Sequence, residues 1–392
     1  MKKLLIIVSM TCMCLFADEF VESSTTIGGY GEMHYDMKAN DDDGKLDFHR
    51  FIFYIKHQFN SQWSLMSEIE VEHNMVGSYY EDCTIDDAGV ETCNDGGSLS
   101  SKGGYVAMEQ AYLNYWNGTW GWKGGVLLVP AGITNEYHEP PTFMSVERPE
   151  YNKYIIPTTW FDNGFAFYGT MSDFNWKVAF TGDLDGDAIG AGIRSGRMKG
   201  VSSTTTSWTK TVQGSWTGMT GLKIGGSMTM NDAPTAAVAA QDASTDYVPV
   251  WNAETGMWDM EEVVTNAEAA IPAGKVGVAL SEFNATYAAN NLYARMEYGM
   301  ISYTDNPDGV ESSSGYYLDL GYDIAGLVGC GDDTNLYLWM RTSAYNKDDN
   351  DDAKEISLFG VMYKPMNNIS FKFEAGTAGD DDVMRLGLGY MF

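Results

Sequence analysis

The chain has 392 residues, with 24 basic and 54 acidic side chains and a formal net charge of −30. So acidic a protein repels phosphate backbones, which excludes nucleic acid as a partner. Hydrophobic residues make up 44% of the chain, and glycine (43) and tyrosine (24) are abundant. This mixture suits many short strands better than long helices.

The first segment, residues 1–17, has the pattern of a secretory signal peptide. Lys2 and Lys3 precede an apolar stretch from Leu4 that is too short to cross a bilayer as a helix. No later stretch is long and apolar enough to do so. We therefore expect residues 18–392 to form a single domain that enters a membrane only as a β-barrel.

From Thr25 onward the sequence alternates between apolar and polar residues in segments of about ten, the period of a strand with one oily face. We predict strands over 25–37, 46–59, 63–75, 105–116, 120–130, 162–171, 174–182, 206–217, 221–231, 275–288, 292–303, 315–325, 335–345, 355–364, 368–376 and 382–392. The connections are alternately short and long, and the long ones are acidic. This construction is typical of an all-β transmembrane antiparallel up-and-down barrel of about 16 strands.

The last strand, 382–392, is the clearest of these segments. Met384, Leu386 and Leu388 share one face with Tyr390 and Phe392, and such a row is tolerated where it faces lipid. The ending resembles the C-terminal signal that outer-membrane barrels present to the barrel assembly machinery. Expected partners are therefore that machinery, outer-membrane lipid and lipopolysaccharide. The alternative is the last strand of a soluble sandwich.

The side chains on the other face of each strand include many charged ones. We expect them to line a water-filled lumen, since a barrel of this size leaves an aqueous channel. The lumen candidates are Arg50, Lys56, Glu68, Glu70, Glu72, Lys223, Arg295, Arg341, Lys372 and Arg385. The wall carries both signs, so these residues alone do not predict which ions it prefers.

The segment 124–169 contains LVPAGITNEYHEPPTF, VERP and IIPTTW, and it resembles the phosphate-selective porin O and P family of bacterial outer-membrane porins. Shorter pieces such as GYGEMHYD at Gly29 and YKPMNNISFKFE at Tyr363 extend the resemblance over most of the chain. The resemblance implies a sixteen-stranded barrel, commonly a homotrimer, that passes small solutes. It also implies that the loop after the fifth strand folds inward.

That loop is unusual in its own right, because residues 130–157 carry five prolines that stiffen the backbone. We predict that it narrows the channel, with the constriction-loop candidates Glu136, His138, Glu139, Glu147, Arg148 and Lys153. The alternative is that it covers the barrel mouth or a subunit contact. In the next loop Arg194, Arg197 and Lys199 have no acid between them and are candidate anion contacts; the alternative is a solvated loop.

Metal binding and catalysis have little support in the sequence. Asp183, Asp185 and Asp187 alternate as calcium ligands can, but the glycine and glutamate of an EF-hand are missing, which favours a simple acidic turn. None of the five histidines lies in an H-E-x-x-H motif, and no G-x-S-x-G motif occurs. We predict no cofactor, no metal site and no catalytic residue.

Cys83 and Cys93 lie in one polar loop, where an oxidising compartment would let them form a disulfide, and Cys330 has no obvious partner.

The sequence thus predicts an outer-membrane porin, not an enzyme, with a water-filled channel for passive diffusion of small ions and solutes. Phosphate or other anions are the candidate solutes. The alternative function is an outer-membrane barrel that acts as an adhesin or as a scaffold for a partner protein.

Overall fold

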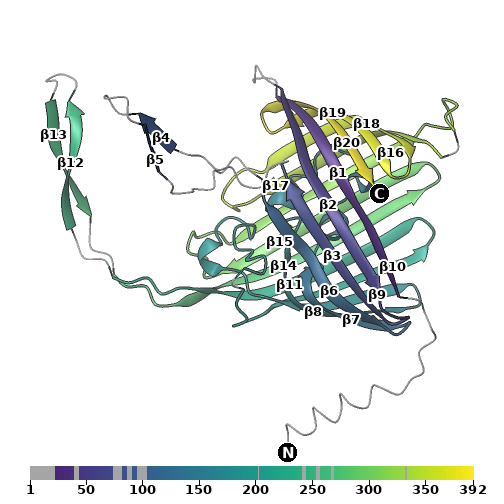
Figure 1. Ribbon diagram of the computed structural model, residues 1–392, viewed down its shortest axis with the longest axis horizontal. Coiled ribbons are helices and arrows are strands. Elements are labelled where there is room, and N and C mark those ends of the chain that lie inside the picture. The colour runs from purple at the N-terminus through teal and green to yellow at the C-terminus, as the bar shows by residue number, and fades with distance from the viewer. Residues whose placement is uncertain are drawn as a thin grey trace, which may run out of the picture.

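The computed structural model describes residues 23–38, 44–73, 82–85, 91–94, 104–201, 203–240, 244–252, 257–265, 269–331 and 333–392. Sixteen antiparallel strands close into a barrel in which each strand pairs with the next barrel strand along the chain (Figure 1). The prediction of a sixteen-stranded up-and-down barrel is confirmed. The predicted signal peptide, residues 1–17, lies outside the described residues and stays a prediction.

The first eight barrel strands are β1 (Ser24–Lys38), β2 (Lys45–Gln58), β3 (Trp63–Glu72), β6 (Val106–Trp116), β7 (Trp120–Leu128), β8 (Phe161–Met171), β9 (Phe174–Thr181) and β10 (Thr209–Met219). The other eight are β11 (Leu222–Thr235), β14 (Gly274–Ala289), β15 (Leu292–Thr304), β16 (Ser312–Asp323), β17 (Asn335–Asn346), β18 (Lys354–Met366), β19 (Ile369–Ala378) and β20 (Asp381–Met391). Each agrees with its predicted segment to within four residues.

The barrel closes where β20 pairs with β1. Phe392 extends this pairing, because its N–H donates to the Gly29 carbonyl (2.9 Å) and its own carbonyl accepts from the Gly29 N–H (3.0 Å). Its ring stacks on Phe51 at 5.8 Å between centroids. Leu386 and Phe392 are about half exposed on the outer wall, so the apolar row of the last strand faces outward as predicted.

The two faces of the wall differ because successive side chains of a strand point to opposite sides. On β19, Phe371 is 47% exposed on the outer face, whereas Lys372 and Glu374 point inward and are buried. The charges of the wall therefore gather in the interior, where they meet the loop described below.

Two hairpins outside the barrel were not predicted: β4 (Asp82–Ile85) with β5 (Glu91–Asn94), and β12 (Ser244–Asn252) with β13 (Met257–Thr265). Both stand away from the barrel beyond its long connections (Figure 1). The register places Cys83 opposite Cys93, and their predicted disulfide stays a prediction. No helix among the described residues is long and apolar enough to span a membrane.

Candidate functional site

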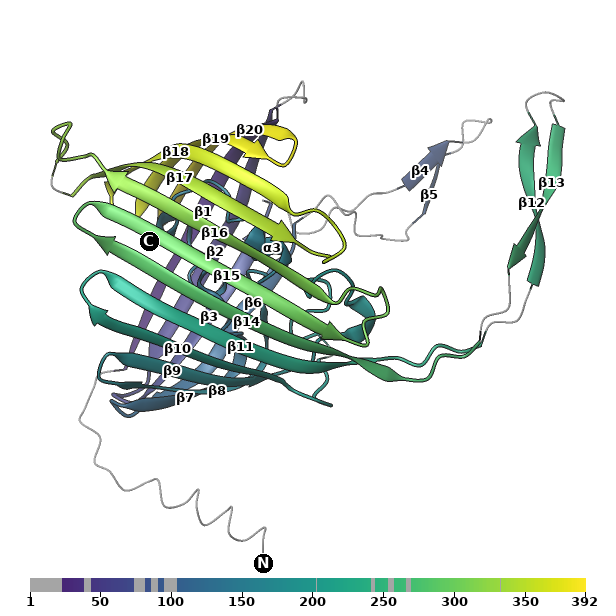
Figure 2. The same cartoon turned by 180° about the vertical axis from the view of Figure 1, so that it is seen from behind.

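The connection between β7 and β8, residues 129–160, folds into the barrel, and its helix α3 (Tyr151–Tyr154) is visible between the strands in Figure 2. It also holds the short helices α2 (Ile133–Glu136) and η1 (Pro140–Thr142). Most of its apolar side chains, including Tyr151, Ile156 and Trp160, are almost fully buried, whereas Tyr137 is exposed. We call residues 129–160 the inward loop.

The neck of the inward loop is closed by hydrogen bonds. The Val129 N–H donates to the Trp160 carbonyl (2.8 Å), so the two ends of the loop lie side by side. The Asn135 side chain donates to the carbonyls of Val129 and Trp160 and accepts from the Trp160 N–H at 2.7 Å. This one amide therefore holds α2 against both ends of the loop.

Charged wall residues hold the far end of the inward loop. The Val146 N–H donates to the Glu374 carboxylate at 2.7 Å, and the Lys372 ammonium donates to the Ser145 carbonyl at 2.6 Å. Buried charges need such partners. Glu374 and Lys372 are therefore anchors of the loop, not free lumen charges.

The opposite wall holds α2. Glu136 pairs with Lys177 of β9 and accepts from Gln213 of β10 at 2.7 Å. Burial raises the pKa of the Glu136 carboxyl, but the charge of Lys177 and the hydrogen bonds from Lys177 and Gln213 together outweigh burial and leave that pKa below its usual value. At the start of α2, Gly132 has a φ of 75°, and Glu297 occupies the space that a Cβ would need. Glycine is the residue that tolerates both conditions.

A buried ion pair between β16 and β17 supports the same loop. Arg341 Nε lies 2.6 Å from Asp319 Oδ1 and Arg341 Nη2 lies 2.7 Å from Oδ2, and both side chains are buried. Because Asp319→Ala would leave the Arg341 guanidinium buried without its carboxylate, we expect a loss of about 3–5 kcal/mol in the free energy of unfolding. Urea unfolding in lipid vesicles measures it, with Asp319→Asn, which keeps the shape, as the matched control. Equal stability of wild type and Asp319→Ala would contradict this role.

The inward loop leaves a cavity on each side of itself. The long-loop cavity, about 500 Å³, lies among strand ends that carry the long connections. Its basic lining residues are Arg50, Arg148, Lys153, Arg194, Arg341, Lys354 and Arg385, and its acidic ones are Asp36, Glu72, Glu147 and Glu150. Basic residues therefore outnumber acidic ones in a protein whose net charge is −30.

The short-turn cavity, about 820 Å³, lies at the end of the barrel where β1 begins, because Ser24 is among its lining residues. Lys56, Lys123 and Lys177 line it, with Glu136 as its acidic residue. An adjoining cavity of about 360 Å³ adds Lys223. Basic residues are thus in excess on both sides of the inward loop.

The structure separates the predicted constriction residues. Glu147, Arg148 and Lys153 line the long-loop cavity, and Glu136 lines the short-turn cavity. His138 is buried against the wall. Glu139 accepts from the Tyr54 hydroxyl at 3.4 Å.

The three predicted anion contacts have different surroundings. Arg194 is exposed and lines the long-loop cavity. Arg197 donates to the carbonyls of Thr158 (2.7 Å) and Thr159 (3.1 Å), so it holds the end of the inward loop. Lys199 lies over the rings of Tyr105 and Phe161. Arg194 is therefore the member of this group that faces the long-loop cavity.

The ten predicted lumen residues fall into two groups. Those that line a cavity are Arg50, Glu72, Arg341 and Arg385 on the long-loop side and Lys56 and Lys223 on the short-turn side. The others, Glu68, Glu70, Arg295 and Lys372, are buried and line neither cavity. Arg50 and Arg341 are also buried in ion pairs, although they border the long-loop cavity. The sequence analysis missed the cavity residues Lys123 and Lys354. Lys123 sits in a glycine-rich strand with weak alternation, and Lys354 begins its strand.

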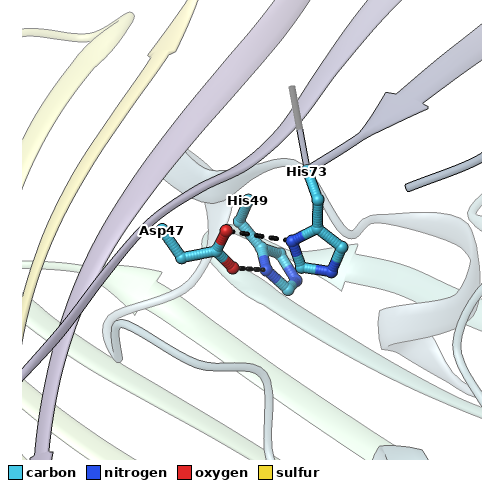
Figure 3. Close-up of side chains that lie close together, drawn as sticks. All are labelled: Asp47, His49 and His73. Atoms are coloured by element: carbon cyan, nitrogen blue, oxygen red, sulfur yellow. Dashed lines mark hydrogen bonds and ion pairs between the residues drawn. The ribbon is translucent and has the colours of Figure 1, made fainter. Parts of the chain in front are cut away.

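Two groups of side chains with metal-ligand chemistry come together although no sequence motif predicts them. Asp47 and His49 of β2 meet His73 at the end of β3 (Figure 3). Asp47 accepts from Nδ1 of both histidines, at 3.0 Å from His49 and 2.9 Å from His73. The other group is Glu68, Glu109 and His138, all buried.

The three aspartates weighed as calcium ligands serve the backbone instead. Asp183 is buried and accepts from the N–H groups of Thr206 and Ser207. Asp185 caps the turn η2 (Gly186–Ala188), and Asp187 accepts from Ala236. They do not converge as a metal-binding group within the described part of the chain.

Comparisons with known proteins place the fold among outer-membrane porins. The loop L8 deletion mutant of OmpT, an outer membrane protein of Vibrio cholerae, superposes with a TM-score of 0.56 at 10% identity, over 94% of this chain and 99% of that one. The anion-selective porin from Comamonas acidovorans gives 0.55 at 11% identity, over 95% and 100%. The outer membrane channel DcaP of Acinetobacter baumannii gives 0.52 at 10% identity, over 96% and 99%. At such identities the likeness shows the fold alone.

No family model matches the chain. An uncharacterized protein of Aquifex aeolicus (strain VF5) is 39% identical over 160 residues, which cover 40% of this chain and 32% of that protein. The chain thus matches about a third of the length of this curated relative.

Proposed function

We propose that the protein is an outer-membrane porin through which small ions and solutes diffuse passively. The observation that carries the proposal is a sixteen-stranded barrel with an apolar outer wall, whose inward loop separates two charged cavities. Such a loop narrows a lumen without filling it. The fold shared with solved porins supports the same function.

Reconstitution tests this proposal. Vesicles that contain the protein should swell in iso-osmotic solutions of small uncharged sugars and should swell more slowly as the sugar grows, because a narrowed pore sorts solutes by size. Heat-denatured protein is the control. Vesicles that stay tight to the smallest sugar would contradict a diffusion channel.

We further propose that the channel prefers anions. Four basic residues of the long-loop cavity are neutralised by ion pairs: Arg50, Arg341, Lys354 and Arg385. Arg148, Lys153 and Arg194 line the same cavity and form no ion pair among the described residues. In the short-turn cavity Lys177 pairs with Glu136, which leaves Lys56 and Lys123 outside ion pairs in the described part of the chain. Charges on the walls of a narrow path set ion selectivity, whereas charges farther than about 8 Å away are screened by physiological salt. Local charge therefore outweighs the net charge of −30.

Phosphate is the solute that the sequence resemblance adds to this proposal. If inorganic phosphate binds in the cavities, adding it to one side of a bilayer should block the chloride current at concentrations far below that of chloride. Sulfate at the same concentration is the control for charge alone. A chloride current that phosphate leaves unchanged would leave a general anion channel.

A second function has one observation in its favour. The hairpins β4–β5 and β12–β13 project from the long-connection end of the barrel (Figure 2) and offer surfaces that an adhesin or scaffold would use. A protein that binds cells or a partner but gives no conductance would support it.

The proposed setting is the outer membrane, with lipopolysaccharide and lipid around the barrel, after insertion by the barrel assembly machinery. We also propose a homotrimer, because one of the superposed structures is a trimer form of OmpT, at a TM-score of 0.54. Cross-linking of intact outer membranes should give a species of three chains. A single-chain species alone would contradict the trimer.

A further inference from the structure

Three side chains from separate parts of the barrel converge between the inward loop and the wall. Glu68 comes from β3, Glu109 from β6 and His138 from the inward loop, and none is more than 2% exposed. A one-residue bulge in β6 brings Glu109 there: Glu68 pairs with Gln110 and the next residue of β3 pairs with Met108, which leaves Glu109 as the extra residue. Bulges commonly re-aim side chains in this way.

The imidazole of His138 is oriented like that of a metal ligand. Its Nδ1 lies 3.1 Å from the Asn135 carbonyl, an acceptor, so Nδ1 carries the proton and donates. Metal-binding histidines commonly donate their other ring N–H to a carbonyl or carboxylate. In the neutral ring, Nε2 then presents a lone pair to the two glutamates.

The distances across the cluster leave room for an ion. Nε2 of His138 lies 3.4 Å from Glu68 Oε1 and 3.5 Å from Glu109 Oε2. These contacts do not have hydrogen-bond geometry, and among the described residues Glu68 Oε1, both Glu109 oxygens and His138 Nε2 are buried without a hydrogen-bond partner. Two ligands of a tetrahedral zinc ion, bound at its usual N and O distances, lie about 3.3–3.5 Å apart.

Among the described residues, no arginine or lysine forms an ion pair with Glu68 or Glu109, and the side chain within ion-pair distance of both is His138. Arg50 is occupied by Glu32 (2.6 Å) and Glu70 (3.0 Å). Arg148 donates to the His138 carbonyl at 3.2 Å. A divalent cation would supply the charge that the glutamate pair lacks.

We propose that Glu68, Glu109 and His138 bind one divalent transition-metal ion, with zinc as the fitting probe, and that this ion fastens the inward loop to the wall. The ligands are one imidazole nitrogen and one oxygen from each carboxylate, a set that zinc accepts. A water molecule completes the fourth position.

The cluster of Asp47, His49 and His73 (Figure 3) serves as the internal control. Its carboxylate already accepts two hydrogen bonds of ordinary length, so those residues are satisfied without a metal. Both clusters combine carboxylates with imidazoles. They differ in whether the facing atoms already have hydrogen-bond partners.

Metal analysis tests the proposal. Protein purified from outer membranes and washed with EDTA should hold about one zinc, or another divalent transition metal, per chain by inductively coupled plasma mass spectrometry. His138→Gln and Glu109→Gln should lose it, and the His49→Gln/His73→Gln double variant should keep it. X-ray absorption at the zinc edge should give a first shell of nitrogen and oxygen, with imidazole scattering and no sulfur.

Refolding in detergent tests the proposal for variants that do not reach the membrane. Wild type refolded in metal-free detergent should gain thermal stability on addition of zinc, and Glu109→Asp should gain less. The proposal is overturned if folded wild type holds no metal and gains nothing from zinc, in which case a protonated His138 bridges the glutamates. It is equally overturned if the His49→Gln/His73→Gln variant is the one that loses the ion.

Discussion

Replacing residues 130–159 of the inward loop by Asn-Gly should raise the single-channel conductance on the order of threefold or more, because an unobstructed sixteen-stranded barrel leaves a wide aqueous lumen. The graft suits the barrel, since Val129 and Trp160 are already hydrogen-bonded across the neck at 2.8 Å. A two-residue turn of this kind joins paired antiparallel strands. The wall charges freed by the deletion, such as Glu297 and Glu374, would be hydrated in the wider lumen.

The matched control for this variant removes the outer hairpin. Deleting residues 239–270 takes away β12 and β13, and the remaining ends already meet, because Thr235 pairs with Gly274. Conductance of this control should equal that of the wild type. If a folded loop-replacement variant conducts no better than the wild type, the inward loop is not the constriction.

Reversing the exposed cavity charges should lower the preference for chloride over potassium. Arg194 and Lys153 are exposed and line the long-loop cavity, so the double variant Arg194→Glu/Lys153→Glu should disturb the barrel little. Reversing one charge at ~8 Å in water changes an ion's energy by about 1 kcal/mol, or about fivefold in local concentration. We expect the permeability ratio of chloride to potassium to fall by about this factor or more.

The hairpin deletion is the control here as well, because it changes the net charge of the protein without changing the residues that line the cavities. It removes seven acidic residues and no basic one, and the strands β12 and β13 stand away from the barrel (Figure 1). The permeability ratio of this variant should therefore stay at the wild-type value. A ratio that follows the net charge, rising after the hairpin deletion, would show that local cavity charge does not set selectivity.

The barrel strands were predictable because lipid imposes one rule on the outer face of every strand. Outside the barrel the rule lapses. β12 and β13 form a separate sheet outside the barrel. The rule of an oily outer face does not apply to STDYVPVWN and MWDMEEVVT, and the sequence analysis placed them in a long acidic connection.

The site was predictable only in part, because parity gives the direction of a side chain but not what it meets. Arg341 and Lys372 both point inward, yet Arg341 lines a cavity and Lys372 holds the inward loop. The sequence analysis did not predict Glu109 as an inward-facing residue, because the bulge turns it inward beside Gln110, against strict alternation. The contact between Asp47 and His73 was not predicted, because no sequence spacing indicates that this part of β2 lies beside the end of β3.

The reversal potential in a potassium chloride gradient is the most direct measurement of the central claim, that local basic residues and not the net charge govern a passive channel. The current through wild-type protein in a planar bilayer should change sign at a voltage close to the chloride equilibrium potential, despite the net charge of −30. The preference should persist when the salt concentration is raised tenfold, because charges that line the path are screened less than distant ones. A reversal on the potassium side, or a bilayer that shows no conductance, would contradict the account.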